Sequence, residues 1–190
     1  MIFERLKSDS HVSITLCLSN PVYLEGEMSL LLKVDGERTH ILSFTIVPGD
    51  VVGCDAEYAI LISRLQGVKN NGGCLSHRAA ISLGVQPQKA LLDALQGVAL
   101  AIGIHYLSGI RAKYQSFYSE EHAGLFLKAY DQFYADNGMS ATSDSIFASP
   151  VPLSFGPIRA SNRRRARMRR ATRREIIESV QQSIAAKCGA

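Results

Sequence analysis

The first part of the chain alternates polar and apolar residues, which is the pattern of half-buried β-strands. The alternation covers residues 11–18, 28–34 and 39–47. Asp35-Gly36 is a turn signal between the last two segments, which are therefore predicted to pair as a hairpin. The apolar residues 58–65 predict the next strand, and consecutive strands most often pair as neighbours. These segments predict an antiparallel meander.

The rest of the chain is mostly helical in its periodicity. Residues 76–83 predict a short helix, and residues 87–102 predict a longer one that ends at Gly103. The later segments follow in the order strand 105–110, helix 120–137, an edge or irregular strand over 145–155 and a long helix from residue 161. A meander followed by a strand–loop–helix–strand unit predicts a mixed α/β (α+β) fold.

Length and charge refine this picture. A chain of 190 residues, 46% hydrophobic and 20% charged, is expected to form one compact domain. Residues 1–158 hold 11 basic and 15 acidic residues, a net charge of −4. Residues 159–190 hold ten basic and two acidic residues, a net charge of +8. We therefore expect an acidic α/β domain over 1–158 and a basic C-terminal helix over 159–190 that packs on it.

The cysteines argue against a disulfide framework. Cys17, Cys54, Cys74 and Cys188 form no CxxC pair, so free thiols in a reducing compartment are expected. Cys74 and His77 have a ligand-like spacing, but a zinc site needs more ligands, and no metal is expected. The first residues lack the pattern of a signal peptide, so the expected location is cytoplasmic. The basic C-terminal helix adds a peripheral position at the inner membrane as an alternative.

The loop after the fourth predicted strand is a candidate anion site. A strand that leads into a glycine-bearing loop and then a helix presents backbone N–H groups to a phosphate. The candidate cofactor-binding residues are Gln66, Gly67, Lys69, Gly72 and Gly73. The alternative is a surface loop in which glycine and asparagine serve turn geometry alone.

Two residues are candidates for proton transfer. Tyr134, near the end of a predicted helix, would act as a general acid if it faces a cleft. His105, at the beginning of a predicted strand, would act as a base. The alternatives are a tyrosine packed with Phe126 and Phe133, and a buried histidine with one hydrogen bond.

The arginine-rich helix has three interpretations: binding to an anionic membrane, contact with phosphates of nucleic acid or of an acyl-carrier cofactor, or a solvated face paired with the acidic body. The candidate contact residues are Arg163, Arg164, Arg167, Arg170 and Arg174. No aromatic residues interleave with the arginines, and no helix-turn-helix or zinc pattern precedes them. A membrane surface or an acidic protein partner is therefore favoured over nucleic acid.

Four segments together resemble the VirK/YbjX family of bacterial proteins. They are Leu65-Gln66-Gly67, Leu83-Gly84-Val85-Gln86-Pro87, Tyr130-Asp131-Gln132-Phe133 and residues 161–170. The resemblance spans most of the chain. It implies a role in virulence and in resistance to envelope stress and antimicrobial peptides, and it implies no catalytic residue.

A second resemblance is to GNAT-type acyltransferases, which share the predicted order of elements. Their last helix commonly reads Tyr-x-x-x-Gly-Phe, and residues Tyr134 to Met139 are similar. The resemblance implies that Tyr134 protonates the thiolate of coenzyme A. The usual Gln/Arg-x-x-Gly-x-Gly/Ala turn is absent, and Gln66-Gly67 with residues 70–73 stands in its place.

The resulting hypothesis is an acyltransferase that moves an acyl group from acyl-CoA or an acyl carrier protein to an amine or hydroxyl acceptor, either a small molecule or a lipid-like one. The alternative is a non-enzymatic factor that docks its basic helix on a membrane surface or a protein partner.

Overall fold

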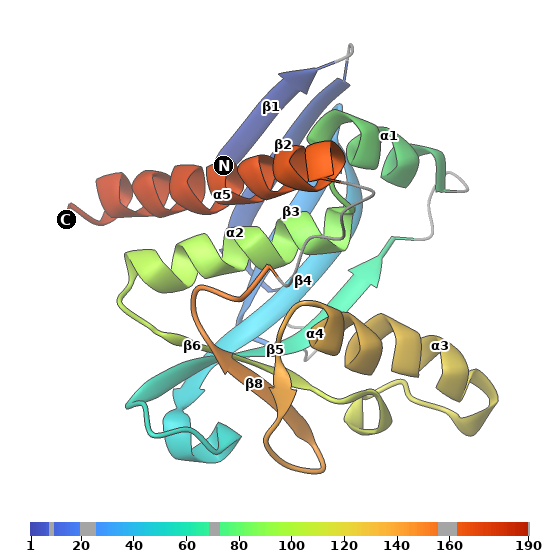
Figure 1. The fold of residues 1–190 in the computed structure, drawn as a ribbon, viewed down its shortest axis with the longest axis vertical. Helices are drawn as coiled ribbons and strands as arrows, with labels where there is room; N and C mark the ends of the chain where they lie inside the picture. Colours follow the sequence, from blue (N-terminus) through green and yellow to red (C-terminus); the bar gives the residue numbers. More distant parts are fainter. Residues whose placement is uncertain (8–9, 20–25, 69–72, 156–162, 190) are drawn as a thin grey trace.

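The computed structural model describes residues 1–7, 10–19, 26–68, 73–155 and 163–189. Within these residues, eight strands form one sheet in the order β1-β2-β3-β4-β5-β6-β8-β7 (Figure 1). The strands are β1 (Phe3–Lys7), β2 (Ser10–Leu18), β3 (Met28–Val34), β4 (Glu37–Pro48), β5 (Tyr58–Gly67), β6 (Tyr106–Ile110), β7 (Ser140–Ala141) and β8 (Ile146–Pro150).

The sheet is mostly antiparallel and the fold is mixed α/β, as predicted. Every pair of neighbouring strands is antiparallel except β5 and β6, which are parallel. The predicted hairpin is confirmed as β3 and β4, and Asp35 and Gly36 both take positive φ in its turn. The sequence pattern does not predict β1, because five residues that end in charged and exposed positions are too few to establish an alternation.

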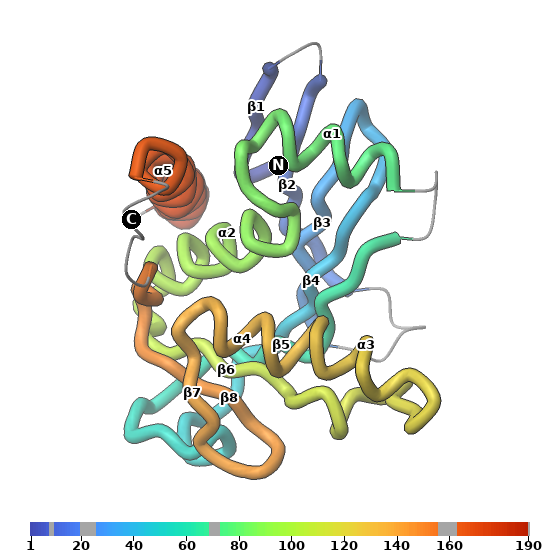
Figure 2. The backbone as a smooth tube through the Cα atoms, turned by 45° about the vertical axis from the view of Figure 1, so that its right-hand side comes forward, coloured from blue at the N-terminus to red at the C-terminus, as the bar shows by residue number. Residues whose placement is uncertain are grey.

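Helices cover one face of this sheet. They are α1 (Cys74–Leu83), α2 (Pro87–Ala101), α3 (Ala123–Leu127), α4 (Phe133–Asp136) and α5 (Arg163–Cys188), with short 3₁₀ turns at Gly49–Val52, Ala112–Tyr114 and Glu120–His122. A π-helical turn, Lys128–Gln132, joins α3 to α4. We refer to Ala123–Asp136 as the α3–α4 segment, and it confirms the helix predicted over 120–137. Figures 1 and 2 show α1 and α2 against the sheet and α5 beside α2.

Close packing joins α2 to α5. Gly97 permits the approach, because a Cβ atom there would lie 2.5 Å from the carbonyl oxygen of Ile177 and 2.8 Å from Cβ of Val180. The last helix packs through an apolar stripe, since Ile177, Val180 and Ile184 are all buried. The basic helix therefore packs on the same body as the sheet.

A buried ion pair also links the two helices. Arg173 donates from Nε and Nη2 to the carboxylate of Asp93, with distances of 2.8 Å. Gln96 donates to the same carboxylate at 3.1 Å and accepts the amide of Leu153 at 2.8 Å. Burial raises the pKa of Asp93 to about 6, although the hydrogen bonds from Arg173 oppose that rise. This network fixes both α5 and the chain after β8 over α2.

The last helix contacts the first strand as well. Arg5 of β1 forms an ion pair with Glu175 and donates to the carbonyl of Leu83 at 3.3 Å. Lys187 Nζ donates to the carbonyl of Met1 at 2.6 Å. Because β1 is an edge strand of the sheet, α5 ties down that edge.

Candidate functional site

The two parallel strands at the centre of the sheet separate after a short stretch of pairing. β5 and β6 pair only from Ile60–Leu107 to Ile62–Gly109. The register of β5 against β4 then shifts at Ser63, whose hydroxyl donates to the carbonyl of Ser43 at 3.1 Å. Past Ile62, the edge of β5 that faces β6 pairs with no strand among the described residues. The two strands therefore diverge along this part of β5.

An apolar cavity of about 850 Å³ lies at the end of β5, which is within the usual size of small-molecule sites. The first turn of α2 and the α3–α4 segment complete its wall, and Figure 2 shows that segment beside β5. The lining residues are Leu65, Gln66, Gly67, Gln88, Phe117, Leu125, Phe126, Lys128, Ala129, Tyr130 and Phe133. We call this space the apolar cavity.

Aromatic packing and one carboxylate hold the helical wall in place. Phe126 stacks on Tyr130 with a centroid distance of 6.0 Å, and Tyr130 lies 6.4 Å from Tyr134. Asp131 accepts the amide of Ala112 at 2.7 Å and Nε of Arg111 at 3.1 Å. These contacts anchor the wall to the chain that follows β6.

Tyr134 does not line the apolar cavity. Its side chain is fully buried beneath β6, where a Cβ atom on Gly109 would lie 2.4 Å from the tyrosine ring. Its hydroxyl has no hydrogen-bond partner among the described residues, and burial raises its pKa well above 10. The tyrosine in the cavity wall is Tyr130, one turn earlier, which sequence reasoning missed.

His105 lies away from the apolar cavity. It is exposed at the beginning of β6, and its carbonyl accepts the amide of Val151 at 2.9 Å. The cavity lies beyond the opposite end of the paired stretch of β5 and β6. The structure therefore does not bring His105 together with Tyr134 or with the loop after β5.

Only part of the predicted anion loop can be placed. Gln66 and Gly67 line the apolar cavity, while Gly73 precedes α1 with φ +82. Lys69 and Gly72 lie outside the described residues. The amide of Val68 donates to the carbonyl of Thr39 at 2.8 Å, so the first amide after Gly67 is engaged with β4. The surroundings of Gln66 and Gly67 suit an apolar group better than a phosphate.

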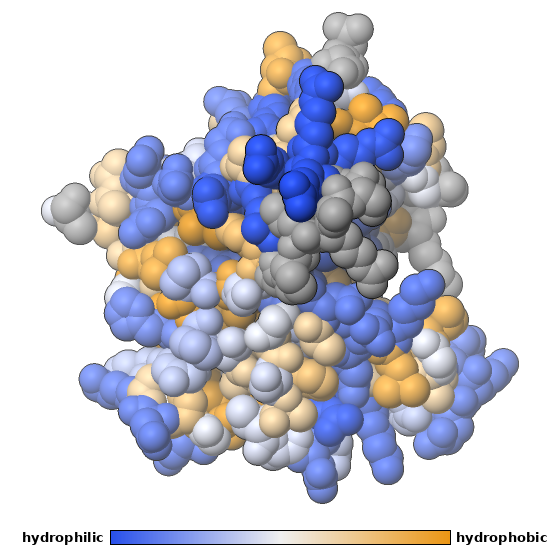
Figure 3. Space-filling model, viewed as in Figure 1, coloured by the Kyte–Doolittle hydropathy of each residue, from blue (hydrophilic) through white to orange (hydrophobic). Residues whose placement is uncertain are grey.

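The candidate arginines separate into two groups. Arg163, Arg164, Arg167 and Arg174 are exposed along α5, and Figure 3 shows the most hydrophilic side chains of that face over the beginning of this helix. Arg170 instead lines a second pocket, between α5 and α2. Sequence reasoning missed the other cationic residues of that pocket, which are Lys89, Arg165, Arg169 and Arg173.

A buried histidine lies next to the strand end. His40 on β4 is only 2% exposed, and its Nδ1 has no hydrogen-bond partner among the described residues. A Cβ atom on Gly67 would lie 3.3 Å from its Nε2. Burial lowers the pKa of His40 from 6.5 to about 4, because the imidazolium form would lose its hydration.

This histidine predicts a dependence of stability on pH. Between pH 6.5 and about 4 the unfolded chain binds a proton that the folded His40 does not, so stability falls as the pH decreases through this range. The expected loss is about 2 kcal/mol, because local relaxation reduces the full effect of the shift. Urea unfolding at pH 4.5 and 7 compares the pH dependence of stability in the wild type with that in His40→Gln.

The comparison between variants is needed because the raised pKa of Asp93 acts in the opposite direction over the same range. The exposed His77 supplies the control, and His77→Gln should keep the wild-type dependence. A pH dependence in His40→Gln equal to that of the wild type would exclude His40 as its source.

Comparison with known proteins identifies a family whose function is unknown. A family model described as a protein of unknown function (DUF535) matches residues 2–186. No curated protein matches the chain. Among the described residues, no helix is long and apolar enough to cross a lipid bilayer, and no three His, Cys, Asp or Glu side chains gather as metal ligands.

Proposed function

Since the chain belongs to the DUF535 family, which is the VirK/YbjX family and has no known activity, we propose its function from the apolar cavity. The protein is an acyltransferase with a GNAT-like fold. It moves an acyl group from a thioester donor, acyl-CoA or an acyl carrier protein, to an amine or hydroxyl acceptor. The role in envelope stress that the resemblance to this family implies favours a lipid-like or peptide acceptor.

One observation carries this proposal: the separation of β5 from β6 beside the apolar cavity. In our proposal, backbone N–H groups of β5, where it diverges from β6, donate to the carbonyl oxygen of a thioester. Such donors stabilise the negative charge that develops on this oxygen when the carbonyl carbon is attacked. The apolar wall, with Leu125 and Phe117 each 67% exposed, would bury the acyl chain.

The residues of the cavity support a simple reaction. The nitrogen or oxygen of the acceptor attacks the carbonyl carbon, the carbon–sulfur bond breaks, and sulfur leaves as a thiolate. Water in the cavity donates a proton to that thiolate. Tyr130 contributes to the wall of the cavity, but its hydroxyl is buried, as that of Tyr134 is, so neither tyrosine is the proton donor in our proposal. The proton of the acceptor passes to water, since His105 lies at the other end of β6.

Filling the cavity tests the proposal. The probe is S-decanoyl-N-acetylcysteamine, a thioester without phosphate, so that binding depends on the apolar cavity alone. At a concentration a hundredfold above its Kd, the probe should raise the wild-type Tm by about 5–10 °C. Ala129→Trp places an indole in the cavity and should abolish this rise, which differential scanning fluorimetry measures.

Ala135→Trp is the matched control, because Ala135 is an exposed alanine of the same helical segment and does not line the cavity. This variant should keep the rise in Tm. The cavity is ruled out as a thioester site if the probe stabilises neither the wild type nor Ala135→Trp. It is also ruled out if the probe stabilises the wild type, Ala129→Trp and Ala135→Trp equally.

The exposed arginines of α5 favour a second candidate function, a non-enzymatic factor that docks on an anionic membrane surface or an acidic protein. Such a factor would act at the cytoplasmic side of the inner membrane. Absence of thioester binding together with salt-sensitive co-sedimentation with anionic vesicles would favour this candidate. Nucleic acid remains the less favoured partner, because the arginines lack interleaved aromatic residues.

A further inference from the structure

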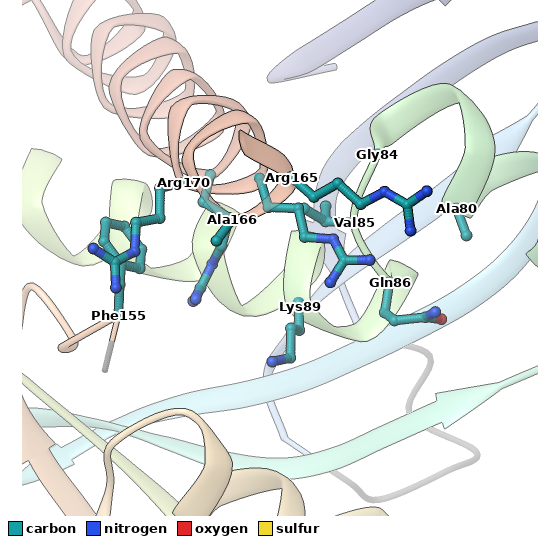
Figure 4. Close-up of a pocket in the computed structure, with 11 residues that line it drawn as sticks. Ala80, Gly84, Val85, Gln86, Lys89, Phe155, Arg165, Ala166 and Arg170 are labelled. Atoms are coloured by element: carbon teal, nitrogen blue, oxygen red, sulfur yellow. The ribbon is translucent and has the colours of Figure 1, made fainter. Parts of the chain in front are cut away.

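A second pocket, of about 390 Å³, lies between the first turn of α2 and the N-terminal half of α5 (Figure 4). Lys89 and Gln86 reach it from α2, while Arg165 and Arg170 reach it from α5. Arg169 and Arg173 also line it. Five cationic side chains therefore border one small space, which we call the cationic pocket.

Within the described residues, the charge of this pocket is only partly balanced by acidic side chains. No carboxylate lines it among the described residues. The carboxylate of Asp93 neutralises Arg173, but Lys89, Arg165 and Arg169 have no ion-pair partner in the described part of the chain. Burial, and then the charge of Arg173, lower the pKa of Lys89. Positive charges held together without a counter-ion favour binding of an anion.

The backbone at the beginning of α2 also favours binding of an anion. The helix bond from the amide of Ala90 to the carbonyl of Gln86 is 3.0 Å, so the amides of Gln88 and Lys89 lie before the intrahelical ladder. The side chain of the N-cap residue Gln86 does not cap this helix. The beginning of a 15-residue helix thus adds its partial positive charge to the side chains around it.

We infer that the cationic pocket binds a phosphate monoester or diphosphate group, held by Lys89, Arg165, Arg169 and the first amides of α2. Guanidinium groups suit this chemistry because they form charge-assisted, bidentate hydrogen bonds with phosphate oxygens. None of the cationic side chains of this pocket lines the apolar cavity, so replacing them tests the site separately from the proposed acyl transfer. The phosphate belongs either to a soluble molecule or to a lipid headgroup.

The first arm of the test uses inorganic pyrophosphate. Isothermal titration calorimetry at fixed ionic strength should give saturable binding to the wild-type protein. Lys89→Gln/Arg169→Gln removes two charges from the pocket and should weaken binding at least about tenfold. Arg163→Gln/Arg167→Gln removes two charges from exposed positions of the same helix and should change binding less than about twofold. Circular dichroism checks that both variants fold, and Arg165→Gln is a second pocket variant.

The second arm identifies the source of the phosphate. Vesicles that contain phosphatidic acid present a phosphate monoester, whereas vesicles of equal charge that contain phosphatidylserine do not. A lipid source predicts co-sedimentation with the phosphatidic acid vesicles alone, lost in the pocket variants but kept in Arg163→Gln/Arg167→Gln. The proposal is overturned if neither probe binds, or if the pocket and control variants weaken binding equally, since general charge then accounts for it.

Discussion

Replacing Arg173 by methionine is expected to lower the free energy of unfolding by about 3–5 kcal/mol, because the buried carboxylate of Asp93 then loses its counter-ion. Arg173 donates three hydrogen bonds to that carboxylate, and Asp93 has no exposed surface. Gln96 would remain as a donor to Asp93, but it also holds the amide of Leu153.

Urea denaturation followed by circular dichroism measures this loss. Arg167→Met is the matched control, because Arg167 is exposed on the same helix, and it should change stability by less than about 0.5 kcal/mol. A double replacement, Asp93→Leu with Arg173→Met, should be less destabilised than Arg173→Met alone, because it leaves no buried charge. Similar stability of Arg173→Met and Arg167→Met would show that the ion pair is not required.

Replacing Gly109 by alanine is expected to lower the free energy of unfolding by about 3 kcal/mol, the upper range for an overpacked core. The new Cβ atom would lie 2.4–2.7 Å from ring atoms and the hydroxyl of Tyr134. Neither residue can move easily to relieve this clash, because Gly109 lies in a paired central strand and Tyr134 is fully buried. Thermal or urea unfolding measures the effect.

A second substitution shows whether the cause is steric. Tyr134→Leu removes the ring, so Gly109→Ala should cost much less in this background than in the wild type. Equal losses of stability from Gly109→Ala in the two backgrounds would mean that the contact with the Tyr134 ring is not the cause. The same cycle tests whether Tyr134 is a packing residue, as its burial indicates.

The local elements were predictable because short segments carry their own signals. The hairpin of β3 and β4 follows from alternation and from the Asp35-Gly36 turn, and α2 follows from leucines at helical spacing after Pro87. The choice between Tyr130 and Tyr134 was not predictable in this way. A π-helical turn adds a residue to the helix at Lys128–Gln132, so a constant period of 3.6 does not give the faces of this segment.

The charged residues show a second reason why part of the site was not predictable from the sequence. Arg173 lies four residues before Ile177, so the apolar stripe of the last helix places it on the buried face. Arg165 and Arg169 precede Arg173 at the same four-residue spacing, so they lie on the same side of the helix. This spacing is the signal that sequence reasoning missed. The partner, Asp93, lies 80 residues earlier. No local pattern reveals that contact, and the cationic pocket depends on it.

The contact between the last helix and the first strand has a consequence for biosynthesis. On the ribosome, β1 emerges before Glu175 and Lys187, which hold it and Met1, are synthesised. This edge of the sheet therefore lacks its covering helix until α5 has also emerged. Chaperones that shield exposed strands would act on the nascent chain during that interval.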